Sequence, residues 1–289
     1  MDEREVVAEE APEEIAGDPK LPAARDYLMA TYFASGSRTV YYQRQLQVLA
    51  EGQFFHWITA YALGQLVAAG RIGSETQPFG AGAIRYYWPR GHRDRKTQVK
   101  AIRKLIDRMA EPGFARGVGR HGETMIDAAL PRIKMVPVAS EAREFNGEAW
   151  TSTQHDLDRI FELDGVAYGI EIKNQLQYID FGEFDTKLAM CRKLKIKPLF
   201  VMRMLPKSYT WEVYRQGGYA LIMKYQLYPH GAEDFAKEVR DTLALPVDAP
   251  PSIHQPTLNR LLAWHHGTRD VPANSVRIHG QVVEWEPNH

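Results

Sequence analysis

The sequence of 289 residues has little cysteine, no long apolar run and no net charge. Its single cysteine, Cys191, excludes an internal disulfide and a zinc site built from several cysteines, and it indicates a reducing compartment. No apolar run approaches the length of a membrane span. The first residues are acidic, unlike the basic and apolar start of a secretion signal. We therefore expect a cytoplasmic protein with no membrane partner.

Charge is balanced overall, with 36 basic and 36 acidic residues, but it is unevenly distributed. Residues 1–19 are strongly acidic and contain two prolines, which predicts a disordered acidic tail over residues 1–20. The rest of the chain is therefore net positive. Two segments, residues 85–108 and 187–207, are rich in Lys and Arg. Such runs are often only solvated faces, but two of them would suit a polyanionic partner.

The strongest local signal is a β-hairpin between residues 156 and 174. Asp164-Gly165 is typical of a two-residue type I′ turn, and alternating apolar and polar residues flank it. With these two residues as the turn, Leu163 pairs with Val166 and the register of the whole hairpin is fixed. Because side chains alternate along a strand, the register also predicts which residues share a face.

Two carboxylates are brought side by side by this register. Asp158 lies opposite Glu171, and Asp156 lies opposite Lys173, with all four side chains on one face. Like charges directly opposite each other destabilise a sheet, so the pair has no evident structural purpose. A hard divalent cation such as Mg²⁺ (or Mn²⁺) would relieve the repulsion, because carboxylates are among its preferred ligands. The other face is predicted to carry Leu157, Arg159, Ile170 and Ile172.

An Asp, a hairpin and then Glu-Ile-Lys together resemble the active site of the PD-(D/E)XK nuclease superfamily, whose fold is restriction-endonuclease-like. The Asp of that pattern matches Asp158, and its Glu-X-Lys matches Glu171 to Lys173; Leu157 stands where a Pro is usual. The resemblance implies an α/β (α+β) core, with a mixed central sheet flanked by helices, in the order helix, three strands, helix, strand. It also implies that Asp158 and Glu171 hold the metal, while Lys173 positions the attacking water.

Four further residues are candidates near this site. Glu123 resembles the acidic residue that completes the metal shell from the first helix of the superfamily core. A Glu at a helix start is equally explained by the helix dipole. Asp156 would orient Lys173, while Gln175 and Gln177 would contact phosphate or orient Lys173, or would simply end the strand. The candidate catalytic set is therefore Asp158, Glu171, Lys173 and Glu123, of which all but Lys173 are candidate metal ligands.

An N-terminal domain is expected over residues 21–92. Helical spacing over residues 22–34, 41–49 and 54–69, followed by a hairpin over 72–88, resembles a winged helix-turn-helix domain. A packing or dimerisation module is the alternative. On the third helix, an apolar face that includes Trp57 is predicted to turn inward. The candidate nucleic-acid contacts are His56, Thr59, Gln65, Arg85, Arg93, Lys96, Lys187 and Lys193.

The nuclease domain is expected over residues 93–245. We predict a short helix over 123–130, a helix capped by Asp180 with Glu183 three residues later, and a buried strand over 198–205. Residues 246–289 form an extension of unknown role. Its His265-His266 pair has no nearby Cys or acidic partner in the sequence, so it is weak evidence for a metal site.

Together these features predict a metal-dependent DNA endonuclease that hydrolyses phosphodiester bonds. Its substrate would be double-stranded or branched DNA, and cutting two strands would suit a homodimer. The competing function is a non-catalytic winged-helix DNA-binding regulator that keeps the nuclease fold as a scaffold. A scaffold could have relieved the carboxylate repulsion by substitution, so the intact Asp, Glu and Lys favour the enzyme. The sequence does not distinguish restriction, repair, recombination and phage defence.

Overall fold

A computed structural model describes residues 17–268, 276–278 and 281–283. The chain divides into two compact units. The first contains the chain up to Ala115 together with Glu238–Leu245, and the second contains Arg116–Lys237 and the chain from Pro246 onward. The sequence placed a boundary at residues 92 and 93 instead. The predicted acidic tail falls largely outside the described residues. No helix in the described ranges is both long and apolar enough to cross a bilayer.

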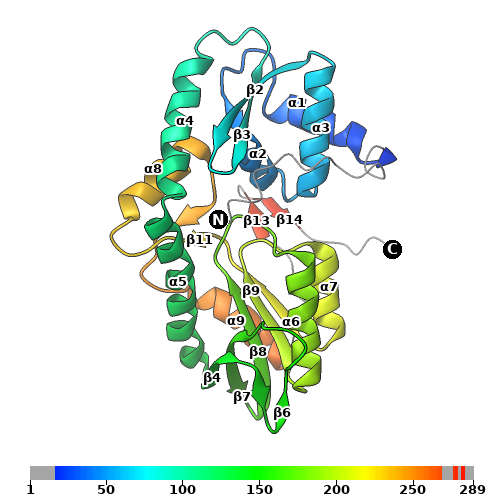
Figure 1. Ribbon diagram of the computed structural model, residues 1–289, viewed down its shortest axis with the longest axis vertical. Helices are drawn as coiled ribbons and strands as arrows, with labels where there is room; N and C mark the ends of the chain where they lie inside the picture. Colours follow the sequence, from blue (N-terminus) through cyan, green and yellow to red (C-terminus); the bar gives the residue numbers. More distant parts are fainter. Residues whose placement is uncertain (1–16, 269–275, 279–280, 284–289) are drawn as a thin grey trace. The chain divides into compact units, whose positions relative to one another are not determined.

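The first unit combines helices with a small antiparallel sheet in the strand order β1-β3-β2 (Figure 1). The predicted helices and hairpin are confirmed. The segment Glu238–Leu245 returns to this unit, where Gln45 Nε2 donates a buried 2.8 Å hydrogen bond to the carbonyl of Leu243. Its elements are α1 (Leu21–Thr31), β1 (Tyr41–Tyr42), α2 (Gln43–Leu49), α3 (His56–Ala68), β2 (Ile72–Phe79), β3 (Gly82–Pro89), α4 (Arg95–Met109) and the end of α8 (Glu233–Leu243).

The core of the first unit is built from one face of each helix. Leu28 of α1, Leu46 of α2 and Leu63 of α3 are fully buried in one cluster. The prediction for Trp57 was wrong, because its side chain is 47% exposed and Ile58 takes the inward position. On α4, four apolar residues are buried while the lysines at every fourth position are exposed. We call these lysines the α4 lysine row: Lys96, Lys100 and Lys104.

The second unit is a mixed α/β unit around a five-stranded sheet in the order β10-β9-β8-β7-β4. Strands β4, β7 and β8 are antiparallel neighbours, whereas β9 and β10 continue the sheet parallel to β8. Its elements are α5 (Pro112–Ala129), a 3₁₀ turn (Leu130–Ile133), β4 (Val136–Ala142), β5 (Glu144–Phe145), β6 (Glu148–Ala149), β7 (Leu157–Leu163), β8 (Val166–Lys173), α6 (Phe181–Lys193), β9 (Lys197–Met202), α7 (Lys207–Arg215), β10 (Tyr219–Ile222), β11 (Gln226–Leu227), β12 (Val247–Asp248), α9 (Gln255–His265), β13 (Val276–Ile278) and β14 (Gln281–Val283).

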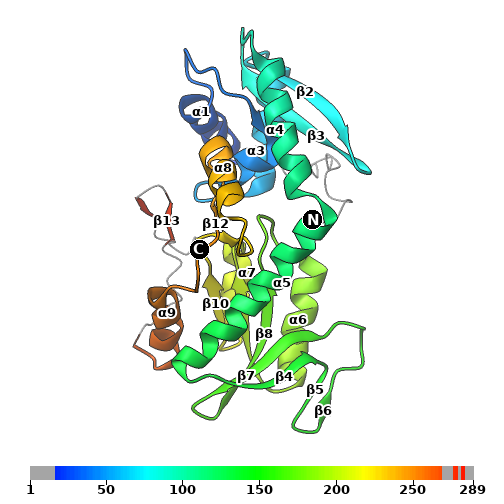
Figure 2. The ribbon, with the colours of Figure 1, turned by 90° about the vertical axis from the view of Figure 1, so that its left-hand side faces the viewer.

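Helices cover both faces of this sheet. One face packs against α5 and α9 through a cluster that includes Ile126, Ile170 and Leu258. The other face packs against α6 and α7, with Phe184 against Phe200 at a ring-centroid distance of 5.1 Å. Figure 2 shows α5 crossing in front of the sheet, with α6 on its far side. A strand buried on both faces was predicted at residues 198–205, and β9 confirms it.

The β7–β8 hairpin has the predicted register, with Leu163 paired to Val166 and Arg159 paired to Ile170. Asp164 and Gly165 both have positive φ angles, 50° and 75°, as a type I′ turn requires. One residue departs from the predicted alternation. Leu157, at the start of β7, lies in the cluster that faces α6 rather than with Ile170.

Helix α5 is longer than predicted. A helix was expected over residues 123–130, but it begins at Pro112 because the Glu111 carboxylate caps the first turn, accepting hydrogen bonds from the backbone of Gly113 and Phe114. Gly122 permits a close approach of this helix to Asn174, the residue that follows β8. A Cβ atom there would lie 2.4 Å from the Cβ of Asn174, so only glycine fits without a shift.

Candidate active site

The predicted carboxylate pair lies where the start of β7 meets the end of β8, on the face that α6 covers. The paired residues of the ladder extend to Arg159 and Ile170, and Asp158 and Glu171 are the next residues along the two strands. Asp158 is half-buried, and its Oδ2 accepts a 2.6 Å hydrogen bond from the backbone N–H of Ile172. This bond fixes one carboxylate oxygen, and the other remains for a ligand.

Glu171 is the most buried member of the pair, with 1% of its surface exposed. Its Oε1 lies 3.0 Å from Lys173 Nζ, and its Oε2 lies 2.6 Å from Lys187 Nζ. Neither oxygen accepts a hydrogen bond of good geometry within the described part of the chain, so these contacts are electrostatic rather than directional. A buried carboxylate is costly unless it is paired with a cation, and the two ammonium groups supply that pairing here.

The electrostatics of the pair favour protonation. Burial raises the pKa of Glu171 to about 7, and the neighbouring Asp158 adds to this rise, although Lys173 and Lys187 oppose it. Burial likewise raises the pKa of Asp158, against the hydrogen bond from Ile172 and the nearby lysines. Without a bound cation, Glu171 is therefore partly protonated near neutral pH, which reduces the negative charge of the pair.

Lys173 stays protonated at neutral pH. Burial alone would lower the pKa of this lysine, but Glu171 and Glu183 outweigh burial and raise it. Its Nζ lies 2.7 Å from Glu183 Oε1. Glu183 stands in the first turn of α6, where Asp180 Oδ1 accepts a hydrogen bond from its backbone N–H, as predicted. The cap of α6 thus sets the position of the carboxylate that orients Lys173.

Lys187 belongs to this site, which corrects its predicted role as a nucleic-acid contact. Its side chain is 5% exposed, too buried for an encounter with a phosphate backbone. Besides pairing with Glu171, its Nζ donates a hydrogen bond to the backbone carbonyl of Asp156. Its place could have been inferred from the sequence, because Lys187 lies one helical turn after Glu183 and shares its face of α6.

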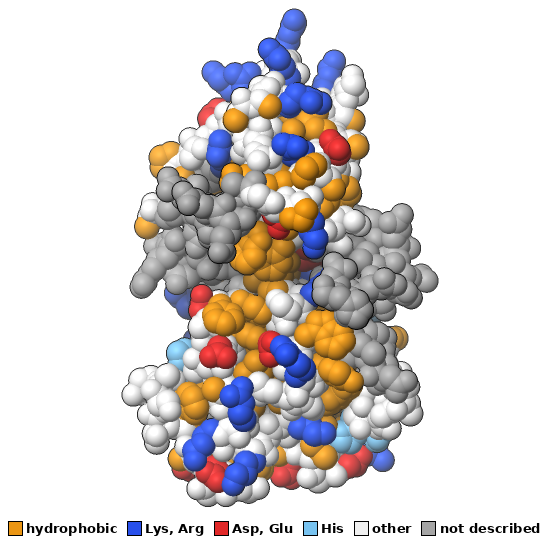
Figure 3. Space-filling view, turned by 90° about the vertical axis from the view of Figure 1, so that its right-hand side faces the viewer, with side chains coloured by type: hydrophobic (Ala, Val, Ile, Leu, Met, Phe, Trp, Pro, Cys, Tyr) orange, Lys and Arg blue, Asp and Glu red, His pale blue; other side chains and the backbone are white. Residues whose placement is uncertain are grey.

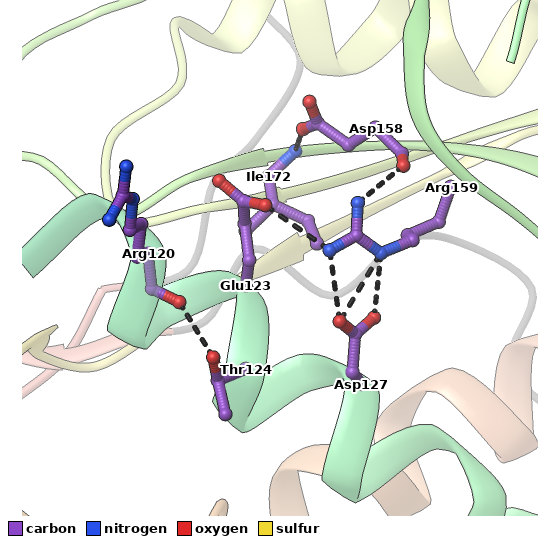
Figure 4. A network of polar contacts seen from close by, with 7 residues as sticks. All are labelled: Arg120, Glu123, Thr124, Asp127, Asp158, Arg159 and Ile172. Atoms are coloured by element: carbon purple, nitrogen blue, oxygen red, sulfur yellow. Dashed lines mark hydrogen bonds and ion pairs between the residues drawn. The ribbon is translucent and has the colours of Figure 1, made fainter. Parts of the chain in front are cut away.

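Glu123 lies on α5, which covers the other face of the sheet, and it is engaged by Arg159. Its Oε2 is 3.2 Å from Arg159 Nη2, and Asp127, one turn further along α5, lies 3.0 Å from the same nitrogen. In Figure 4 the Arg159 guanidinium lies against these two carboxylates, while the Asp158 side chain points away towards the Ile172 nitrogen. Arg159 also donates a 2.6 Å bond to the backbone carbonyl of Asp158. It therefore links Glu123 to the strand that carries the site.

The supporting candidates are Asp156, Gln175 and Gln177. Asp156 contributes its backbone carbonyl to Lys187, whereas Lys173 pairs with Glu171 and Glu183. Gln175 and Gln177 are half-buried in the bend that follows β8.

Two predicted nucleic-acid contacts on α3 turn out to face inward. Thr59 is fully buried, so it cannot reach a groove, because the α3 face that carries Ile58 and Thr59 packs inward. His56 is half-buried, and burial lowers its pKa to about 4, which keeps it neutral. Gln65 is also half-buried, and its Oε1 accepts a 3.0 Å hydrogen bond from Arg25 Nη1.

The basic candidates are more accessible. Arg93 and Lys96 are exposed, and Lys193 is exposed with its Nζ 2.8 Å from Glu148 Oε2. Arg85 is half-buried, with its guanidinium 5.6 Å from the ring centre of Tyr87. The sequence analysis missed the α4 lysine row as a set, although its spacing of four is readable. Figure 3 shows Lys and Arg side chains gathered at one end of the first unit.

No protein-family model, curated protein or solved structure matches the chain.

Proposed function

We propose that the second unit is a metal-dependent DNA endonuclease with a PD-(D/E)XK, restriction-endonuclease-like core. The pairing of half-buried Asp158 with buried Glu171, with Lys173 beside them, is the observation that carries the proposal. The order of elements supports it, because α5, three antiparallel strands, α6 and the parallel strand β9 follow the order that the resemblance implies. The strands β4, β7 and β8 are the three that this order requires.

The residues of the pair fit a hard divalent cation. Both oxygens of Glu171 lack directional hydrogen bonds, and Asp158 keeps a second oxygen beyond the one that Ile172 engages. Carboxylate oxygens suit Mg²⁺ and Mn²⁺. When bound, the cation would lower the pKa of a water ligand and neutralise charge on the scissile phosphate. Glu123 would join the ligands only by leaving Arg159, so we assign the cation to Asp158 and Glu171.

The lysines have separate tasks in this mechanism. Lys173 has a raised pKa and keeps its proton, so it acts as a cation that orients the attacking water and stabilises the pentavalent phosphate, not as a general base. Glu183 holds its ammonium in place. Lys187 is buried and contacts Glu171, so its task is to keep that carboxylate ionised and fixed in direction.

DNA is proposed to bind the first unit as well. Its order of helix, short strand, two helices and hairpin supports a winged-helix-like domain. The exposed α4 lysine row, 96-100-104, would lie along a phosphate backbone, where each neutralised phosphate releases counterions.

One experiment tests the enzymatic proposal. The purified protein is incubated with plasmid, linear, branched and single-stranded DNA, with Mg²⁺, with Mn²⁺ or with a chelator. We expect cleavage only with a divalent ion, and loss of at least a hundredfold in rate for Lys173→Ala with its circular dichroism unchanged. Lys224→Ala is the matched control, because this exposed lysine of the second unit lies outside the pair and outside the proposed DNA contacts, and its kcat should be unchanged.

Two results would contradict the proposal. Cleavage by Lys173→Ala at the wild-type rate would remove the assigned role of this lysine. Tight DNA binding without cleavage of any substrate would favour the non-catalytic regulator.

A further inference from the structure

A second group of metal-ligating side chains lies at the far end of the β7–β8 hairpin from the carboxylate pair. His265 ends α9, His266 follows it, and Asp164 is the first residue of the hairpin turn. One potential ligand atom from each of the three lies within 4.8 Å of the others. The sequence shows the histidines without an acidic partner, and the fold brings one from 101 residues away.

His265 is oriented as a metal-ligating histidine is. Its Nδ1 lies 2.6 Å from the hydroxyl of Tyr168, a buried residue, and this fixes the ring and directs Nε2 towards the turn. Such a partner on the second ring nitrogen is usual for histidines that bind metal.

The distance from His265 Nε2 to Asp164 Oδ2 is 3.3 Å. This is long for a hydrogen bond between nitrogen and oxygen. It equals the edge, about 3.3–3.5 Å, of a tetrahedron whose metal–ligand bonds are about 2.0–2.1 Å. His266 completes the group, with its ring centre 4.9 Å from that of His265.

We propose that Asp164, His265 and His266 bind a divalent transition-metal ion of the zinc class, with one coordination position open to water. Two imidazoles and one carboxylate select zinc, cobalt or nickel over magnesium. The site is independent of the proposed nuclease function, whose cation is held by carboxylates alone. Its effect would be to fasten α9 to the hairpin turn, since neither element carries all three ligands.

The test uses Co²⁺ as a spectroscopic probe of the full-length protein. We expect the visible absorption of four-coordinate Co²⁺ to appear on titration and to disappear when Zn²⁺ is added. Asp164→Asn and His266→Ala should each weaken Co²⁺ binding at least tenfold. Both variants should fold, because Asn tolerates the positive φ of the turn and His266 is exposed. Tyr168→Phe should weaken binding about tenfold while the spectrum keeps its shape.

Two control variants separate this site from others. His254→Ala removes an exposed histidine at the start of the same helix and should bind Co²⁺ as the wild type does. Asp158→Asn alters the carboxylate pair and should also leave the Co²⁺ absorption intact. Wild-type affinity in both Asp164→Asn and His266→Ala, or no four-coordinate Co²⁺ spectrum at all, would overturn the proposal.

Discussion

Replacing Asp158 by Asn should make the metal-free protein more stable. Asn keeps an oxygen that accepts the hydrogen bond from Ile172 N–H, so the change removes a charge at nearly constant shape. The removed charge is one of the causes that raise the pKa of Glu171. Relief of that repulsion lowers the cost of ionising Glu171 in the folded protein.

The expected gain in stability can be worked out from the rise in the pKa of Glu171. The pKa of Glu171 rises from 4.5 to about 7, and each pKa unit corresponds to about 1.4 kcal/mol, so the ionised form costs roughly 3 kcal/mol. Burial is the larger cause of the raised pKa and the charge of Asp158 is the second. We therefore expect Asp158→Asn to increase the free energy of unfolding by about 1 kcal/mol. For a unit of this size the midpoint of thermal unfolding would rise by roughly 2–4 °C.

The gain should depend on pH in a defined direction. A carboxyl whose pKa is higher in the folded state binds an extra proton there, so the wild type loses stability as pH rises from about 4.5 to about 7. At pH 8 both carboxylates are ionised, and the variant should melt above the wild type. At pH 5 Glu171 is protonated, and the difference should shrink.

Thermal melts of both proteins in a chelator at pH 5 and pH 8 measure this. A variant that melts below the wild type at pH 8 would mean that the Asp158 carboxylate is a structural hydrogen-bond partner. An equal gain at both pH values would mean that Glu171 is not the group responsible.

Three further predictions concern packing, pH and DNA. Gly122→Ala should destabilise the protein by more than about 2 kcal/mol in urea denaturation, because its Cβ would meet Asn174, whereas Gly119→Ala on the same helix has open space and should stabilise by about 0.5–1 kcal/mol. Affinity for Mn²⁺, measured by calorimetry, should fall between pH 8 and pH 6, because protons then compete for Glu171. Reversing the charge of the α4 lysine row should weaken duplex binding and reduce its salt slope by about one per lost phosphate contact; an unchanged slope would place the DNA elsewhere.

Much of the second unit was predictable because its key signals are local. Asp164-Gly165 fixes the register of the hairpin, whose paired residues extend to Arg159 and Ile170, the neighbours of Asp158 and Glu171. Asp180 similarly defines the start of α6. These features depend on neighbours within a few residues, where turn and cap preferences decide the conformation.

The failures share a different cause, which is packing between distant segments. Thr59 was placed outside because helical spacing does not say which face of α3 meets the core. Lys187 reaches Glu171 only because α6 crosses the sheet over the pair. The partner of His265 lies in a turn far away in the sequence. The start of α5 was missed because its glycines disfavour a helix locally, whereas tertiary packing and the Glu111 cap support it.

Binding of Mn²⁺ to the Asp158–Glu171 pair is the property on which the nuclease proposal depends. Electron paramagnetic resonance of free Mn²⁺ measures it, in a His266→Ala background that removes the second proposed site. We predict binding that Asp158→Asn weakens at least tenfold at pH 8, while Glu162→Gln, a change further along the same strand, leaves it unaltered. Equal Mn²⁺ affinity in Asp158→Asn and in its parent would contradict the assignment of the metal to this pair.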